Sequence, residues 1–196
     1  MHQLRIEKRE GGEGVRIWVD SLAEFLGLVE MGVVEVHPWP ATVDDVEHAD
    51  MLVFDLDPGE GVEWDFVVAT ALRMRELLEK EGLAPWPKLT GGKGLHLMAP
   101  LPRKLTHDAA HAYARRLAQR LASTDRERYI TSAALARRPG KLFIDYLRNG
   151  RGTTAVGAYS PRVHEGFPIA APVTWKQVER GIKPDAFTMR RPPRQR

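Results

Sequence analysis

The sequence contains no cysteine and no long apolar run. Without cysteine, disulfides, thiolate zinc sites and a cysteine nucleophile are excluded, so oxygen and imidazole groups are the main metal ligands that remain. No apolar stretch approaches the roughly 18 residues typical of a membrane span, and the segment MHQLRIEKRE lacks the apolar core of a secretory signal. We therefore expect a cytoplasmic protein with no membrane partner, in which any bound metal is a hard cation.

The composition is that of a globular protein, with 43% hydrophobic and 28% charged residues in a chain of 196 residues. This length suits a single domain of ordinary size. The net charge of +3 and a pI near 9.3 permit a polyanionic partner without requiring one. We predict one catalytic domain over residues 1–185, followed by a flexible basic tail over residues 186–196.

Hydrophobic periodicity, together with glycine and proline positions, predicts a mixture of strands and helices. The predicted strands are a hairpin of residues 3–9 and 15–19, and residues 33–39, 51–57 and 141–147, while residues 89–101 are predicted to be a glycine-rich turn that enters a strand. The predicted helices are residues 22–32, 64–82, 107–122 and 129–137, and residues 153–163 are predicted to be irregular. Strands and helices do not alternate strictly, which favours an α+β fold with a central mixed or antiparallel sheet packed by helices.

Two carboxylates end the most apolar of these strands, in MLVFDLDPGEGVEW. On a strand, Asp55 and Asp57 leave the same face with Cα atoms roughly 6–7 Å apart. Two like charges at that separation oppose each other's ionisation unless a cation lies between them, and a divalent metal would meet this need. The alternative is a strand end where Asp-Pro-Gly begins a turn and both carboxylates are solvated.

A third carboxylate, Asp145, lies inside the apolar run KLFIDYL. A buried charge must be paired or bound to metal, so Asp145 either ligates a cation or forms a salt bridge with a nearby arginine. If its strand lies beside the first, three carboxylates converge. Such a group suits two Mg²⁺ or Mn²⁺ ions that hold the attacking and leaving oxygens of an in-line displacement on phosphorus.

The segment KLTGGKGLH supplies groups that suit an anion. Glycine backbone N–H groups can approach a phosphate closely, with Lys93 as a point charge, Thr90 as a hydroxyl donor and His96 as a further donor. The spacing is not that of a Walker A loop. A glycine-rich hairpin with an exposed lysine, and a structural histidine, are the alternatives.

Arg138 and Arg162 lie in non-repetitive segments, RRPGK and YSPRV. Guanidinium groups suit bidentate binding of phosphate oxygens, although solvated surface arginines are the ordinary interpretation of each alone. Taken together, acids for metals, a Gly-Lys-His loop and these arginines indicate phosphoryl or nucleotidyl transfer.

Four segments resemble one known family: EVHPW, FDLDPGEGVEW, KLTGGKGLHLMAPL and RRPGKLFIDYLRNGRGTTAVGAYSPRV. From about residue 20 to residue 180 the chain resembles the polymerase domain of bacterial ligase D, in the archaeo-eukaryotic primase superfamily, which serves nonhomologous end joining. The resemblance implies a primase-like core with two divalent cations, preferably Mn²⁺, and addition of nucleotides to a DNA 3′ end.

By this resemblance Asp55, Asp57 and Asp145 are the catalytic and metal-binding acids. The incoming NTP or dNTP would be held by Thr90, where the family usually has serine, and by Lys93, His96, Arg138 and Arg162. His37 matches a family motif to which we assign no role. The family also implies DNA ends or a primer-template as substrate, a ligase and a Ku-like end-binding protein as partners, and association with the nucleoid.

The chain also differs from the family in extent, since by this resemblance we expect it to lack the N-terminal third that family members carry. That region grips the 5′-phosphate of the downstream strand and stacks on template bases. The alternative to a self-sufficient nucleotidyltransferase is thus a module that binds nucleotide or a DNA end and needs a partner chain for polymerisation. A third alternative is hydrolysis of nucleotides or phosphoesters by the same acids.

Overall fold

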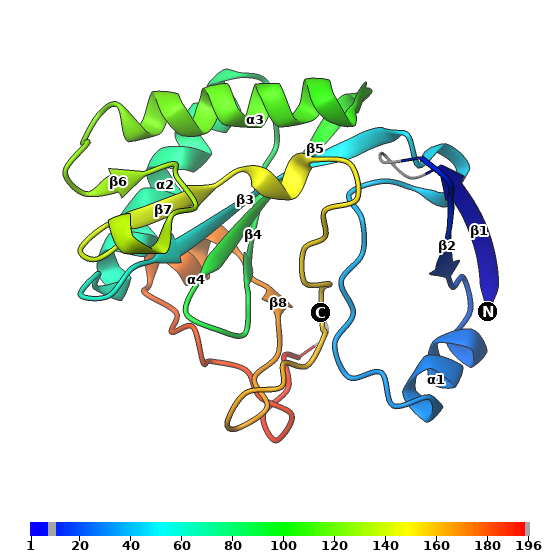
Figure 1. Ribbon diagram of the computed structural model, residues 1–196. Helices are drawn as coiled ribbons and strands as arrows, with labels where there is room; N and C mark the ends of the chain where they lie inside the picture. The colour runs from blue at the N-terminus through cyan, green and yellow to red at the C-terminus, as the bar shows by residue number, and fades with distance from the viewer. Residues whose placement is uncertain (8–10, 195–196) are drawn as a thin grey trace.

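A six-stranded mixed sheet forms the centre of the computed structural model, which describes residues 1–7 and 11–194 (Figure 1). The strand order is β6-β7-β3-β5-β4-β8, with β6 parallel to β7 and the other neighbours antiparallel. The strands are β3 (His48–Pro58), β4 (Trp86–Leu89), β5 (Leu95–Thr106), β6 (Tyr129–Ile130), β7 (Leu142–Asp145) and β8 (Ala171–Pro172). The predicted α+β class and the central position of the strand that carries Asp55 are confirmed.

Two amphipathic helices cover one face of this sheet, α2 (Trp64–Lys80) and α3 (His107–Ala122). α3 begins where the Thr106 side chain accepts a hydrogen bond from Ala109 N. Their apolar side chains pack on Leu52, Phe54 and Leu56 of β3, all fully buried. Because side chains alternate along a strand, Asp55 and Asp57 project from the opposite face, away from both helices. The shorter α4 (Trp175–Glu179) packs beside β4.

A hairpin and a helix precede the sheet. β1 (His2–Glu7) pairs antiparallel with β2 (Glu13–Trp18), as predicted, although residues 8–9 of the predicted first strand lie outside the described residues. α1 (Leu22–Glu30) is capped by Ser21 and is followed by Gly32, whose φ is 82°. No residue of this fully described helix is buried. Figure 1 shows the hairpin and α1 to one side of the six-stranded sheet.

Two predicted elements are wrong. The described residues 33–39 form no strand, because Pro38 and Pro40 lack the N–H that a ladder needs, and this segment instead meets residues 155–157 through single hydrogen bonds. The helix predicted over residues 129–137 is replaced by β6, which pairs with β7, and by the 3₁₀ turn η2 (Leu135–Arg137). In that segment, pairing with a distant strand outweighs local helical propensity.

Another strand, β4, was not predicted, since Pro87 lies within it. Two further 3₁₀ turns complete the regular structure, η1 (Val43–Asp45) and η3 (Leu147–Asn149). As predicted, residues 153–163 contain no regular element in the described structure.

The predicted tail, residues 186–196, is described only as far as residue 194. Ile169 N donates to Phe187 O at 3.0 Å and Met189 N donates to Phe167 O at 3.0 Å, which ties the start of this segment to residues 167–169. The domain boundary at residue 185 and the flexibility of the tail stay predictions. Among the helices of the described residues, none has the length and apolar character needed to cross a membrane.

Gly59 lies where the end of β3 meets the start of β7, and its N–H donates to Lys141 O at 2.9 Å. A Cβ atom there would lie 2.0 Å from Arg138 O and 2.7 Å from Lys141 O. Because these are backbone atoms, we expect Gly59→Ala to lower the free energy of unfolding by about 3 kcal/mol, measured by denaturant titration. The control is Gly27→Ala in α1, where no atom lies within 4 Å of the added Cβ. Equal stability of the two variants would contradict this account.

Candidate functional site

The strand register brings the predicted acids to one face of the sheet. Asp55 lies directly opposite Asp145 of β7 and directly opposite His96 of β5. Residues opposite each other in an antiparallel pair project to the same face, and Asp57, two residues along, shares it. The expectation that the strand of Asp145 lies beside that of Asp55 is confirmed.

A cavity of about 470 Å³ opens above these strands. Of the predicted site residues, Asp55, Asp57, Thr90, Lys93, His96 and Arg162 line it. Residues that we did not assign to the site also line it, among them His37, Arg148, Thr154, Val156 and His164. Asp145 and Arg138 do not line the cavity but contact residues that do.

Each acid is paired with a cation. Asp57 lies 3.1 Å from Lys93 Nζ and accepts a hydrogen bond from Arg138 Nη1 at 2.9 Å. Asp55 Oδ2 lies 3.5 Å from His96 Nε2. Arg148 bridges the other two acids, with Nε 3.2 Å from Asp145 and Nη2 3.9 Å from Asp55. The salt bridge considered for Asp145 is therefore present, and its partner is Arg148.

The facing acids have different pKa values. Burial raises the pKa of Asp55, but the charges of His96, Arg148 and Lys88 outweigh it and hold that pKa below its usual value. Burial also raises the pKa of Asp145, and the charge of Asp55 adds to the rise, against the hydrogen bond from Leu147 N and the charge of Arg148. Asp55 is thus the acid of the pair that ionises first.

The glycine-rich segment is the turn of the β4-β5 hairpin, and it lies between Asp55 and Arg162. Thr90 Oγ1 donates to Gly94 O at 3.0 Å. A Cβ on Gly94 would lie 3.0 Å from Asp55 Oδ1, and one on Gly91, whose φ is 70°, would lie 2.8 Å from Arg162 Cγ. The glycines therefore allow the turn to approach both side chains. The hairpin interpretation of this segment is confirmed, and its binding of an anion stays a prediction.

Glu35 was missed by sequence reasoning, although it belongs to the EVHPW segment. Its carboxylate accepts from Val163 N at 2.7 Å, and it lies 2.9 Å from His37 Nε2 and 3.1 Å from Arg162 Nε. The hydrogen bond from Val163, followed by that from His37, lowers the pKa of Glu35 to about 2. Glu35 therefore orients Arg162 and His37 toward the cavity as a permanent anion.

Arg148 was also missed. Arg148 lies in η3, three residues after Asp145 at the end of β7, and its Nε reaches back to the Asp145 carboxylate at 3.2 Å. The signal available in the sequence for Arg148 was an arginine three residues after an acid in an apolar run.

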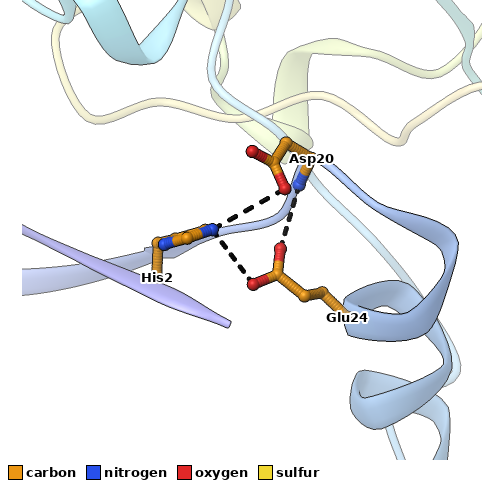
Figure 2. A group of neighbouring side chains, drawn as sticks. All are labelled: His2, Asp20 and Glu24. Atoms are coloured by element: carbon orange, nitrogen blue, oxygen red, sulfur yellow. Dashed lines mark hydrogen bonds and ion pairs between the residues drawn. The ribbon is translucent and has the colours of Figure 1, made fainter.

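Among the described residues, one group has its potential metal-ligating atoms within 4.8 Å of one another, and it lies outside the cavity: His2, Asp20 and Glu24 (Figure 2). His2 Nε2 lies 3.0 Å from Glu24 Oε1 and 3.6 Å from Asp20 Oδ1, while its ring stacks on Trp18 at 4.1 Å. The side chains of His2 and Asp20 are 46% and 60% exposed, and ion pairing accounts for their contacts. Asp55, Asp57 and Asp145 do not form such a group, and each of their carboxylates lies beside a cationic side chain.

Comparison with known proteins decides the family. Residues 1–196 match the family model described as LigD, primase-polymerase domain. The chain belongs to the LigD primase-polymerase family. A solved structure described as the polymerase domain from Mycobacterium tuberculosis ligase D in complex with DNA superposes with a TM-score of 0.85 at 31% identity. That match covers 92% of this chain and 66% of the other, which confirms the primase-like fold.

Relatives of this LigD primase-polymerase domain are longer proteins. The multifunctional non-homologous end joining protein LigD of Pseudomonas aeruginosa is 37% identical over 161 residues, which are 82% of this chain and 19% of that protein. The bifunctional non-homologous end joining protein LigD of Bacillus subtilis is 29% identical over 179 residues, 91% of this chain and 29% of that protein. The chain therefore spans about a fifth to a third of the length of these relatives. About a third of the M. tuberculosis chain is likewise uncovered.

Proposed function

We propose that this LigD primase-polymerase domain is a metal-dependent nucleotidyltransferase that adds nucleotides to a DNA 3′ end in non-homologous end joining. The observation that carries the proposal is the facing pair Asp55 and Asp145, with Asp57 on the same face, beside a cavity lined by cations. The description of the M. tuberculosis domain as a DNA complex and the names of the full-length relatives support DNA ends as the substrate.

The three aspartates fit the divalent cations that the family implies. They are hard oxygen donors on one face of the sheet, and their charges are now offset by Arg148, Lys93 and Arg138. Asp55, Asp57 and Asp145 would hold two Mn²⁺ or Mg²⁺ ions. When bound, these ions would lower the pKa of the primer 3′-hydroxyl and neutralise the triphosphate and the leaving pyrophosphate.

Cationic side chains of the protein would bind the nucleotide. Lys93, His96 and Arg162 line the cavity and would bind the triphosphate of an NTP or dNTP, stabilising charge as it develops on the leaving group. Thr90 orders the glycine turn between them, and Arg138 holds Asp57 while it stacks on the ring of Phe143 at 4.0 Å. We add Arg148 to this set because it alone contacts both facing acids among the described residues.

A ligase and a Ku-like end-binding protein are proposed as partners from the end-joining role that the relatives' names state. A cytoplasmic location at the nucleoid follows from the same proposal, since the substrate would be a chromosomal DNA end.

The proposal is tested by incubating the chain with Mn²⁺, labelled ATP and a gapped DNA that bears a 5′-phosphate. We expect extension of the 3′ end, its loss on addition of EDTA, and its return when Mn²⁺ is restored in excess. The products are resolved on a denaturing gel. Extension that persists in EDTA would contradict metal dependence, and release of free nucleotide products without extension would favour hydrolysis.

A second candidate is a module that binds nucleotide or a DNA end and polymerises only with a partner chain. The cavity lined by Lys93, His96 and Arg162 would bind a nucleotide in this case as well. Retained Mn²⁺-dependent ATP binding without extension would support this candidate over the first.

A further inference from the structure

We propose that Lys88 is a positioning residue that ties the outer wall of the cavity to the sheet, so that the groups proposed to bind phosphate stay in reach of the aspartates. The effect of Lys88 on nucleotide binding rests on the proposed function, whereas the contact that holds the wall against the sheet does not. We call this contact the tie.

Lys88 is a buried lysine on β4, the strand between β5 and the edge strand β8. It lies on β4 directly opposite His96, which lies opposite Asp55, which in turn lies opposite Asp145, so the four residues form one row across the strands. Lys88 is 2% exposed, and its Nζ donates a hydrogen bond to Val156 O. Burial lowers the pKa of Lys88 to about 8 against the opposing effect of Asp55, which leaves the ammonium group largely protonated at neutral pH.

Val156 belongs to the outer wall of the cavity, which we define as residues 35–38 and 153–163. These two irregular segments join through Gly157 N to Val36 O at 2.8 Å, Ala155 N to Pro38 O at 3.3 Å, and Val36 N to Ser160 Oγ at 2.9 Å. The wall contributes His37 and Arg162 to the cavity that Asp55 and Asp57 also line. The wall is part of no sheet in the described structure, so its position depends on individual contacts with the sheet.

Lys88 supplies one of those contacts at the middle of the wall, and Arg162 Nη1 supplies another by donating to Thr90 O at 2.8 Å. A second cavity of about 250 Å³, lined by Trp39, Trp86, Lys88 and Ala155, lies beside the tie. The wall therefore has space into which it can shift when the hydrogen bond from Lys88 is lost.

A buried ammonium group is a weak source of stability, because its desolvation offsets most of what its hydrogen bond and ionic contacts contribute. Methionine has a similar length and would pack in the same place without that desolvation. A fold that uses lysine at this position gains a directed contact to one carbonyl, and we infer that the contact serves the geometry of the cavity.

The test compares Lys88→Met with wild type and with Lys104→Met, a lysine on β5 that is 40% exposed and pairs with Asp45. Two quantities are measured: hydrogen exchange of the amides of residues 153–158, and KM and kcat for ATP in the Mn²⁺-dependent extension assay. For Lys88→Met we expect faster exchange in the wall, a KM raised about tenfold and a kcat changed by less than about twofold, with no loss of thermal stability. Lys104→Met is expected to match wild type in every measurement.

If hydrogen exchange of the wall amides is unchanged in Lys88→Met, the proposal that Lys88 holds the wall is wrong. If exchange is faster but the KM for ATP is unchanged, the proposed role of Lys88 in nucleotide binding is wrong. If wild type shows neither extension nor ATP binding, the proposed function fails, and the exchange measurement still decides whether Lys88 holds the wall. Should the methionine variant not fold, Lys88→Gln, which keeps a shorter donor, is expected to show the same exchange and KM changes to a smaller extent. Wild-type exchange and KM in that variant would equally contradict the proposal, because a shorter donor should hold Val156 O less closely.

Discussion

Alanine in place of Asp57 is expected to abolish nucleotide addition and to leave the fold intact. Asp57 lies on the cavity face between Lys93 and Arg138, where its charge is proposed to hold a divalent cation. Loss of that charge should lower kcat by roughly 10³-fold or more. Stability should fall by about 1–3 kcal/mol, because Lys93 is 67% exposed and its ion pair is screened by solvent, whereas Arg138 is 16% exposed and loses a hydrogen-bond acceptor. Extension assays and thermal unfolding measure the two effects.

Two further variants make the result specific. Asp57→Asn keeps the size and a hydrogen-bond acceptor for Arg138 but removes the charge, so it should be as inactive as the alanine variant. Asp44→Ala removes an exposed carboxylate of η1, outside the cavity, and should retain wild-type activity. Wild-type turnover in either Asp57 variant would remove the basis for the metal assignment.

Asn149→Ala is expected to be the most destabilising polar substitution that we predict. The Asn149 side chain is fully buried and bonds both backbone groups of Val53, accepting from its N–H at 2.8 Å and donating to its C=O at 2.8 Å. Its amide also donates to Tyr146 O at 2.7 Å. Without Asn149, a buried strand N–H and carbonyl lose their partners, which should lower the free energy of unfolding by about 3 kcal/mol.

The same substitution should affect the site, because Asn149 fixes η3 against β3 and so places Arg148 between Asp55 and Asp145. Denaturant titration measures the stability, and the KM for ATP, expected to rise, reports the position of Arg148. The control is Gln119→Ala on the exposed side of α3, expected within about 0.5 kcal/mol of wild type. An Asn149→Ala variant as stable as the control would show that Val53 finds other hydrogen-bond partners.

Long periodic elements and buried runs were predictable because their signals are local. The helices over residues 64–80 and 107–122, and the central strand of Asp55, follow from apolar spacing and from caps such as Thr106. The predicted helix over residues 129–137 failed because β6 pairs with β7, and composition within a short window does not contain that pairing. The predicted strand over residues 33–39 failed for a local reason, since Pro38 and Pro40 lack the N–H groups that a ladder needs.

Some features of the candidate site are likewise visible in the sequence, and others depend on the tertiary structure. The residue types of Asp55, Asp57, Asp145 and Lys93, together with the same-face spacing of the first two, are properties of the sequence and already indicate chemistry on phosphate. The sequence does not contain the register that sets Asp55 opposite Asp145, the position of Arg148 between them, or the burial of Lys88 beneath Val156. Strand pairing and packing across more than sixty residues of chain decide these features. The sequence by itself determined which groups are available for the reaction, and only the tertiary structure decided which of them meet, because contact between distant residues depends on how the whole sheet is assembled.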